Sequence, residues 1–397
     1  MTMPARQPST ADGGPAAGPD GITPGRTTPV NITPGNTTLG DTLPVSATPV
    51  LAVPSLTPRA CTTPARRAFW ALALLAGTLL AVLALALLTG SAALPWADVP
   101  RLLLWPDGSG GAEILHRLRL PRALAALSTG ALLALSGALM QVLLRNPLAD
   151  PYVLGLSGGA ALGALIAMAL GLGVVMIHLG AFGGALLAAV VVFGLAQSDL
   201  GRLEVASRPD STPQLLLTGV MLSSLAMAGV SLILTLAPGE RLRGMLFWMM
   251  GDLSGADMPW PVLLAPWLLC LALWPLGREL NLLLAGAGPA QMLGVPVRRM
   301  RAAIYLLASA AAALAVATAG TVGFVGLVVP HALRLLLGND QRLLLPASAL
   351  AGAAFLLAAD TLARSVAEPL QLPVGVITAL VGAPTFIVLL LRGRRRP

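Results

Sequence analysis

The sequence predicts an all-α integral membrane protein with about ten transmembrane helices. Of its 397 residues, 56% are hydrophobic and only 11% are charged, and the mean hydropathy is +0.81. A soluble domain of ordinary composition is about half apolar and about a quarter charged, so these values place the chain in a lipid bilayer. Apolar runs close to the ~20 residues that a spanning helix needs recur along the chain, without the alternation of a β-barrel.

Ten apolar runs follow one another after the first 68 residues. The run 322–337 is short and contains Pro330, which predicts a kink. In chain order the runs cover residues 69–89, 121–144, 152–177, 179–197, 213–236, 258–276, 302–320, 322–337, 343–364 and 374–391.

The first 66 residues differ in composition from the rest. They are rich in Pro, Thr and Gly and poor in large apolar side chains, so they cannot bury enough surface to offset the entropy of ordering. They also lack the pattern of a signal peptide. We expect residues 1–66 to form a disordered cytoplasmic extension and residues 67–397 to form the transmembrane domain.

The distribution of arginines predicts the orientation in the membrane. With the amino terminus inside, fifteen arginines lie on the inner side and seven on the outer side, as the positive-inside rule requires. Both termini are then cytoplasmic. The outer arginines run against the rule and need an explanation: Arg101, Arg117, Arg119, Arg122, Arg241, Arg243 and Arg364.

Several function classes are excluded by composition. The formal charge of +8 sits in short loops, where it orients helices, so we expect no nucleic-acid partner. All 25 basic residues are arginine, and without lysine the chain has no phosphate-binding P-loop, so a partner must handle any ATP. Two cysteines far apart in sequence and three dispersed histidines predict neither a disulfide nor a metal site. We expect no cofactor and no catalytic site.

Small residues recur at the spacing of closely packed helices. Gly155, Gly159 and Gly163 are each four residues apart, as are Gly180 and Gly184. Such spacing lets the backbones of membrane helices approach one another.

Two long motif blocks are more specific than composition. The first contains Arg119-Leu120-Pro121-Arg122, Arg145-Asn146-Pro147-Leu148 and Leu154-Gly155-Leu156-Ser157-Gly158-Gly159. The second contains Gly323-Phe324-Val325-Gly326-Leu327-Val328-Val329-Pro330-His331, Ala359-Asp360-Thr361-Leu362-Ala363-Arg364 and Leu372-Pro373-Val374-Gly375. In this order, over residues 69–395, they resemble the binding-protein-dependent ABC importer permeases of the FecCD/BtuC type, which serve iron-siderophore, haem and vitamin B12 uptake.

The resemblance implies a BtuC-like type II ABC importer permease in the bacterial cytoplasmic membrane. Two such ten-helix subunits, identical or closely related, would enclose a path for an iron chelate or vitamin B12. Two ATP-binding subunits would dock on the cytoplasmic side, and a periplasmic or lipid-anchored binding protein would deliver the substrate. The chain itself would be a transporter subunit and not an enzyme.

The resemblance also implies roles for particular residues. Arg119, Arg122 and Arg364 would meet acidic residues of the binding protein. The alternative is that they reach the lipid headgroups or that Arg364 pairs with Asp360, four residues earlier on the same helix.

Two cytoplasmic segments carry further expected roles. Asn146 and Leu148 are candidates for the cytoplasmic gate; Pro147 would stop the helix and the asparagine would satisfy its freed carbonyls. In the connection 280–301, the loop that couples to the ATPase would include Gly288, Gln291, Leu293 and Gly294. Where the family usually has a Gly-Glu pair and then Ala-Arg, this chain has residues 286–291 without charge.

Two rival classes remain open at this point. Gly155-Leu156-Ser157-Gly158-Gly159 fits the G-x-S-x-G pattern and His331 lies in another span, so a rhomboid-like intramembrane serine protease with Ser157 and His331 is one alternative. A purely structural membrane scaffold is the other.

Overall fold

The computed structural model describes residues 65–90, 94–202, 212–254, 260–366 and 370–393, and within these ranges the ordered elements are helices. The expected extension at 1–66 falls almost wholly outside the described residues, and its disorder stays a prediction. The first helix, α1, begins at Ala65.

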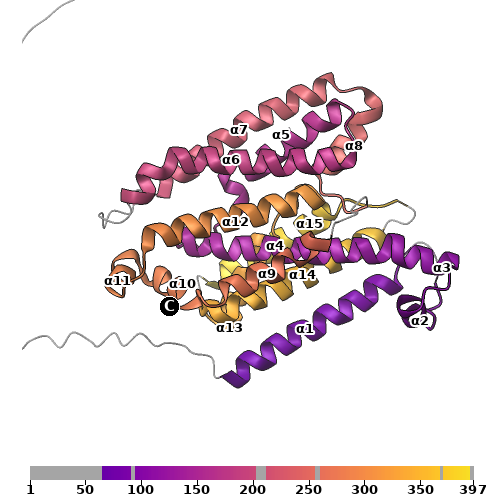
Figure 1. Ribbon diagram of the computed structural model, residues 1–397, viewed down its shortest axis with the longest axis horizontal. Helices are drawn as coiled ribbons and strands as arrows, with labels where there is room; N and C mark the ends of the chain where they lie inside the picture. The colour runs from indigo at the N-terminus through magenta and orange to yellow at the C-terminus, as the bar shows by residue number, and fades with distance from the viewer. Residues whose placement is uncertain (1–64, 91–93, 203–211, 255–259, 367–369, 394–397) are drawn as a thin grey trace, which may run out of the picture. The chain divides into compact units, whose positions relative to one another are not determined.

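The elements follow the predicted apolar runs, with shorter helices between them (Figure 1). In chain order they are α1 (Ala65–Leu88), α2 (Val99–Leu104), α3 (Gly110–Glu113), the π-helical turn η1 (Ile114–Arg119), α4 (Leu120–Leu143), the 3₁₀ turn η2 (Pro151–Leu154), α5 (Leu156–Ala169), α6 (Val174–Arg202), α7 (Thr212–Leu236), α8 (Gly239–Met249), α9 (Trp260–Leu273), α10 (Gly277–Ala285), α11 (Ala287–Met292), α12 (Val297–Ala319), α13 (Val325–Leu337), α14 (Gln341–Ser365) and α15 (Val374–Gly393).

Seven helices in the described ranges are long and apolar enough to cross a membrane, and an eighth span results if α9 and α10, bent by 69°, count as one. The runs 152–177 and 322–337 instead give the short apolar helices α5 and α13. Each of the ten predicted runs therefore contains a helix, but ten complete spans remain a prediction.

Two predicted boundaries were wrong. The span placed at 121–144 begins at Gly110, because α3, η1 and α4 are continuous. The run 152–177 is interrupted after Ala169, where Gly171 adopts a left-handed backbone (φ +69°) and α6 begins at Val174. Glycine alone adopts that conformation without a steric cost, so the chain can turn there inside an apolar stretch.

Helix α4 is the centre of the larger hydrophobic core, and it packs against α14, α12, α13 and α9 (Figure 1). Its small residues allow this, since a Cβ on Gly130 would strike the backbone of Gly352 in α14, and one on Gly137 would strike Gly326 in α13. Hydroxyl groups add hydrogen bonds to α12, for example from Ser136 Oγ to the Ala308 carbonyl at 2.6 Å. Backbone contact through small residues and side-chain hydrogen bonds are the forces that hold helices together in lipid.

A second core joins α5, α6 and α7 and is linked to α12. Gly159 and Gly163 of α5 lie directly against Gly184 and Gly180 of α6, which confirms the close packing that the glycine spacing predicted. The hydroxyl of Tyr305 on α12 donates to the Ala189 carbonyl of α6 at 2.9 Å and ties the two groups of helices together.

Candidate functional site

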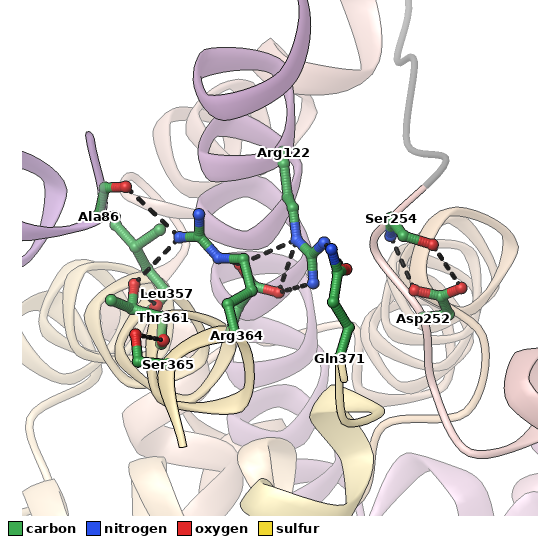
Figure 2. A network of polar contacts seen from close by, with 10 residues as sticks. Ala86, Arg122, Asp252, Ser254, Leu357, Thr361, Arg364, Ser365 and Gln371 are labelled. Atoms are coloured by element: carbon green, nitrogen blue, oxygen red, sulfur yellow. Dashed lines mark hydrogen bonds and ion pairs between the residues drawn. The ribbon is translucent and has the colours of Figure 1, made fainter. Parts of the chain in front are cut away.

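The fully buried carboxylate of Asp360, near the end of α14, is the centre of a group that we call the outer arginine cluster: Arg119, Arg122, Asp360 and Arg364. Arg122 of α4 donates to Asp360 Oδ1 from Nε at 3.0 Å and from Nη2 at 2.9 Å. Nε of Arg364 lies 3.1 Å from Asp360 Oδ2. Figure 2 shows both guanidiniums reaching in from their helices toward one point. One carboxylate thus joins α4 to α14.

The sequence places Arg119 and Arg122 on the same helix face because they are three residues apart. The π-helical turn η1 ends at Arg119, just before Pro121, whose ring cannot donate the backbone hydrogen bond of a regular helix. Gln371, just before α15 (Val374–Gly393), adds to the cluster by accepting from Nη1 of Arg122 at 2.7 Å (Figure 2).

The other contacts of the cluster are to the carboxyl end of α1. Nη1 of Arg119 donates to the carbonyls of Leu87 at 2.7 Å and Leu88 at 3.1 Å, and Nη2 of Arg364 donates to that of Ala86 at 3.4 Å. The last carbonyls of a helix have no partner within the helix, and they form the negative end of its dipole. The guanidiniums of Arg119 and Arg364 therefore supply hydrogen-bond donors and positive charge to the carboxyl end of α1.

The structure brings all three predicted docking arginines together, but with their charge directed inward. Arg119 is 5% exposed, and the side chains of Arg122 and Arg364 are 11% and 10% exposed. The intrahelical pair of Arg364 with Asp360 is present, and Asp360 also holds Arg122, which sequence reasoning missed. A buried aspartate and an arginine far away in sequence carry no local signal of pairing.

The predicted gate residues lie in the segment after α4, residues 145–150, which we call the gate segment. Asn146 and Leu148 are both exposed. Asn146 Oδ1 accepts from the Leu148 N–H at 2.9 Å, so the expected role of the asparagine, to satisfy helix carbonyls, was wrong: its side chain closes a turn instead. Helix α4 ends because Arg145 adopts a left-handed backbone (φ 48°).

Asp150 is the last residue of the gate segment and caps η2. Its carboxylate accepts from the Tyr152 N–H at 2.8 Å, and burial raises the pKa of this carboxyl to about 6. The hydrogen bond from Tyr152 opposes that rise because it stabilises the charged form.

The predicted coupling loop forms two short helices, α10 and α11, which we call the coupling helices. Gly288, Gln291, Leu293 and Gly294 are all exposed on or after α11. Between them lies Met292, which is 90% exposed, beside Leu293 at 67%. Sequence reasoning missed Met292, although a methionine next to leucine in a cytoplasmic connection is an available signal of an apolar contact surface.

The two residues of the protease alternative lie in packed helices. Ser157 is the second residue of α5, and the glycines around it pack α5 against α6 and α7. His331 is buried on α13 with its ring 6.4 Å from that of Phe386. Within the described part of the chain, no hydrogen bond joins Ser157 to His331, and no three His, Cys, Asp or Glu side chains group as metal ligands would. The protease alternative has no support.

Comparison with known proteins agrees with this geometry. The sequence model of the FecCD transport family matches residues 78–392. The ABC transporter permease protein YvrB of Bacillus subtilis is 42% identical, over 77% of this chain and 89% of its own length. The cobalamin import permease BtuC of Halobacterium salinarum is 43% identical (76% and 80%), and the hemin transport permease HmuU of Yersinia pestis is 40% identical (80% and 95%).

The fold is also known from a solved structure. It shows an inward-facing ABC transporter proposed to be of the metal-chelate type, with a TM-score of 0.69, 31% identity, and coverage of 82% of this chain and 99% of its own. With a family match over most of the chain and relatives matched along most of their own length, this multi-pass membrane protein belongs to the FecCD transport family of ABC transporter permeases.

Proposed function

We propose that the chain is the permease subunit of an importer that moves an iron chelate (a siderophore or haem) or vitamin B12 across the bacterial cytoplasmic membrane. The observation that carries the proposal is the identity of 40–43% with permeases named for cobalamin and hemin, matched along 80% or more of their length. Iron would travel inside its chelate, so the permease would need no metal ligands of its own.

ATP hydrolysis would reside in two separate subunits bound to the coupling helices. The chain has no lysine for a P-loop, and Met292 with Leu293 offers an exposed apolar tip between Gly288 and Gly294. The uncharged sequence of residues 286–291 favours apolar contact over ion pairs at this surface.

A second permease subunit, identical or closely related, would complete the transport path. Asn146 and Leu148 would gate its inner end, which fits their exposure in the gate segment. Both termini would be cytoplasmic. This orientation would put Arg119 and Arg241 on the outer side against the positive-inside rule, and their bonds to the last carbonyls of α1 and α5 would account for them there.

The outer arginine cluster would receive the binding protein. The cluster contains three guanidiniums and one carboxylate, which pairs with two of them, so it has an excess of two positive charges near the outer ends of α4 and α14. Arg122 and Arg364 would offer their remaining donors to carboxylates of the partner, while Arg119, the most buried, would hold α1 in place.

Transport can be tested in proteoliposomes that contain the chain, its ATPase subunit and its binding protein. We expect ATP-dependent uptake of one among cyanocobalamin, hemin and a ferric hydroxamate. Vesicles without the ATPase subunit, or with ADP, are the control. Uptake of none of these substrates, or equal uptake without ATP, would refute the proposal.

Docking can be tested separately by binding-protein association with the assembled transporter. Arg364→Gln should slow association about tenfold at low salt and less at high salt, because rim charges act mainly on the on-rate. The exposed outer residue Arg101 gives the matched control Arg101→Gln. An unchanged on-rate for Arg364→Gln would show that the cluster has a purely structural role.

A further inference from the structure

The side chain of Asn281 on α10 ties the coupling helices to the first turn of α14. Its Nδ2 donates to Asp340 Oδ1 at 2.9 Å, and its Oδ1 accepts from the Gln341 N–H at 2.9 Å. Asp340 is the residue that caps α14, and its Oδ1 also accepts from the Arg342 N–H at 3.1 Å. The NH₂ group and the carbonyl oxygen of the Asn281 side chain thus both form hydrogen bonds at the start of α14, where free backbone N–H groups need acceptors.

A second contact lies one turn earlier on the same face of α10. A Cβ on Gly277 would lie 2.6 Å from Cγ of Arg342, so only glycine fits there without displacing that side chain. Gly277 and Asn281 are four residues apart, which puts them one above the other. Two contacts on one face fix the direction of α10 as well as its position.

The coupling helices also lie beside the gate segment. Gly286, which separates α10 from α11, is buried and has a φ of +134°. A Cβ placed on it would lie 3.9 Å from Nη1 of Arg145, the first residue of the gate segment. A displacement of α11 would therefore act at two places, the start of α14 and the gate segment.

We infer that Asn281 is a positioning residue that makes the coupling helices and α14 move as one body. Without this amide, the ATPase would move α11 while α14 stays behind, and ATP would be spent without transport. The inference rests on the proposed function, because it assumes that an ATPase subunit docks on α11. Asn281 itself touches neither substrate nor nucleotide in this scheme.

An exchange of two residues gives a specific test. Asn281→Asp places a second carboxylate against Asp340, and the two charges repel each other at this distance. Combining Asn281→Asp with Asp340→Asn reverses the direction of the hydrogen bond between the two side chains and keeps the acceptor for the Gln341 N–H. The Arg342 N–H loses the Asp340 oxygen that it shares with Asn281, so a remaining effect of the exchange is expected at the start of α14 and not in the coupling helices. Asn339→Asp is the matched control. Asn339 is exposed, and this substitution adds the same charge beside the same end of α14.

The anchoring is measured by hydrogen exchange of the full chain in lipid nanodiscs. We expect amides of residues 277–294 to exchange about tenfold faster in Asn281→Asp, and at the wild-type rate in the exchanged pair and in Asn339→Asp. Equal rates in Asn281→Asp and the wild type would overturn the anchoring. Faster exchange that persists in the exchanged pair would also overturn it, since the damage would then come from something other than this contact.

The coupling is measured in proteoliposomes as ATP hydrolysed per molecule taken up, with cyanocobalamin and hemin as probes. We expect this ratio to rise about tenfold in Asn281→Asp and to return in the exchanged pair. A wild-type ratio in Asn281→Asp would overturn the positioning role even if the helix is loosened. If wild-type vesicles take up neither probe, a ferric hydroxamate is used as the third. Uptake of none of the three would count against the proposed function, and the exchange rates alone would then decide the anchoring.

Discussion

The outer arginine cluster and the coupling helices lie at opposite ends of α14, and they expose opposite kinds of surface. From Asp340 to Asp360 the helix rises about 30 Å, roughly the thickness of the apolar part of a bilayer. At the outer end, charged groups are buried and bonded to the chain itself. At the inner end, Asn281 and Asp340 hold α10 against α14, while the apolar side chains of Met292 and Leu293 are exposed.

The difference shows that a charged residue near the membrane surface of this protein need not be a site for a partner. Several arginines that break the positive-inside rule are used within the chain, as Arg119 at the end of α1, Arg241 at the end of α5 and Arg243 over the ring of Phe247 show. The exposed tip of α11, formed by Met292 and Leu293, in contrast has no charge. Substitutions at the outer end should therefore act first on stability, and substitutions at the inner end on partners.

The largest effect is expected for Asp360→Ala. It removes the counter-charge of both Arg122 and Arg364 in a buried site, which should cost about 3–5 kcal/mol of unfolding free energy and most of the inserted protein. Unfolding in detergent and the yield in membranes measure this loss. Asp252→Ala is the control, because among the described residues that carboxylate bonds only to the neighbouring, exposed Ser254 (Figure 2). Similar stability of the two variants would contradict the structural role of the cluster.

A smaller loss is expected for Arg119→Ala. The buried carbonyl of Leu87 and the partly buried one of Leu88 would lose their donor, at a cost of about 1–3 kcal/mol. Arg117→Ala should change stability by less than about 0.5 kcal/mol, since the one ion pair of Arg117 in the described part of the chain is an exposed one with Glu113. The comparison is made by thermal unfolding of the purified chain. If Arg119→Ala unfolds like Arg117→Ala but no longer binds the binding protein, docking is the main role of Arg119.

Hydropathy predicted where the helices lie better than where they begin and end. The start of the second long helix was missed because residues 110–119 contain His116, Arg117 and Arg119, which mask a continuous helix. The turn at Gly171 was missed because it lies inside an unbroken apolar run. Local composition does not report a change of backbone direction that a single glycine allows.

For the candidate site, the motif resemblance identified residues but not their contacts. It grouped the outer arginines, yet the bond between Arg122 and Asp360 depends on how α4 packs against α14. The contact of Asn281 with Asp340 depends on α10 folding back to α14, and no periodicity predicts that. Contacts between distant segments follow from tertiary packing, which a single sequence does not state.

At the inner end, Met292→Ser should act on the partner and leave the chain intact. Losing an apolar side chain from the contact should weaken ATPase binding about tenfold, while the unfolding temperature of the free chain stays the same. Binding of the purified ATPase subunit to nanodiscs measures this. Met250→Ser on the outer side, where Met250 is 40% exposed, is the control. Equal binding by the two variants would exclude the tip of α11 from the contact.

The finest distinction is expected at Gly294, between two substitutions of the same glycine. Its backbone is left-handed (φ +83°), yet a Cβ there would meet no atom of the chain within 4 Å. Asparagine tolerates this backbone and valine does not, so Gly294→Asn should change unfolding free energy by less than about 0.5 kcal/mol and Gly294→Val by about 1–2 kcal/mol. If the ATPase approaches the backbone closely at this point, both variants should hydrolyse ATP without uptake, because either side chain blocks the approach. If Gly294→Asn instead couples hydrolysis to uptake as the wild type does, the glycine is needed only for its backbone conformation and the ATPase makes its contact through the exposed side chains of α11.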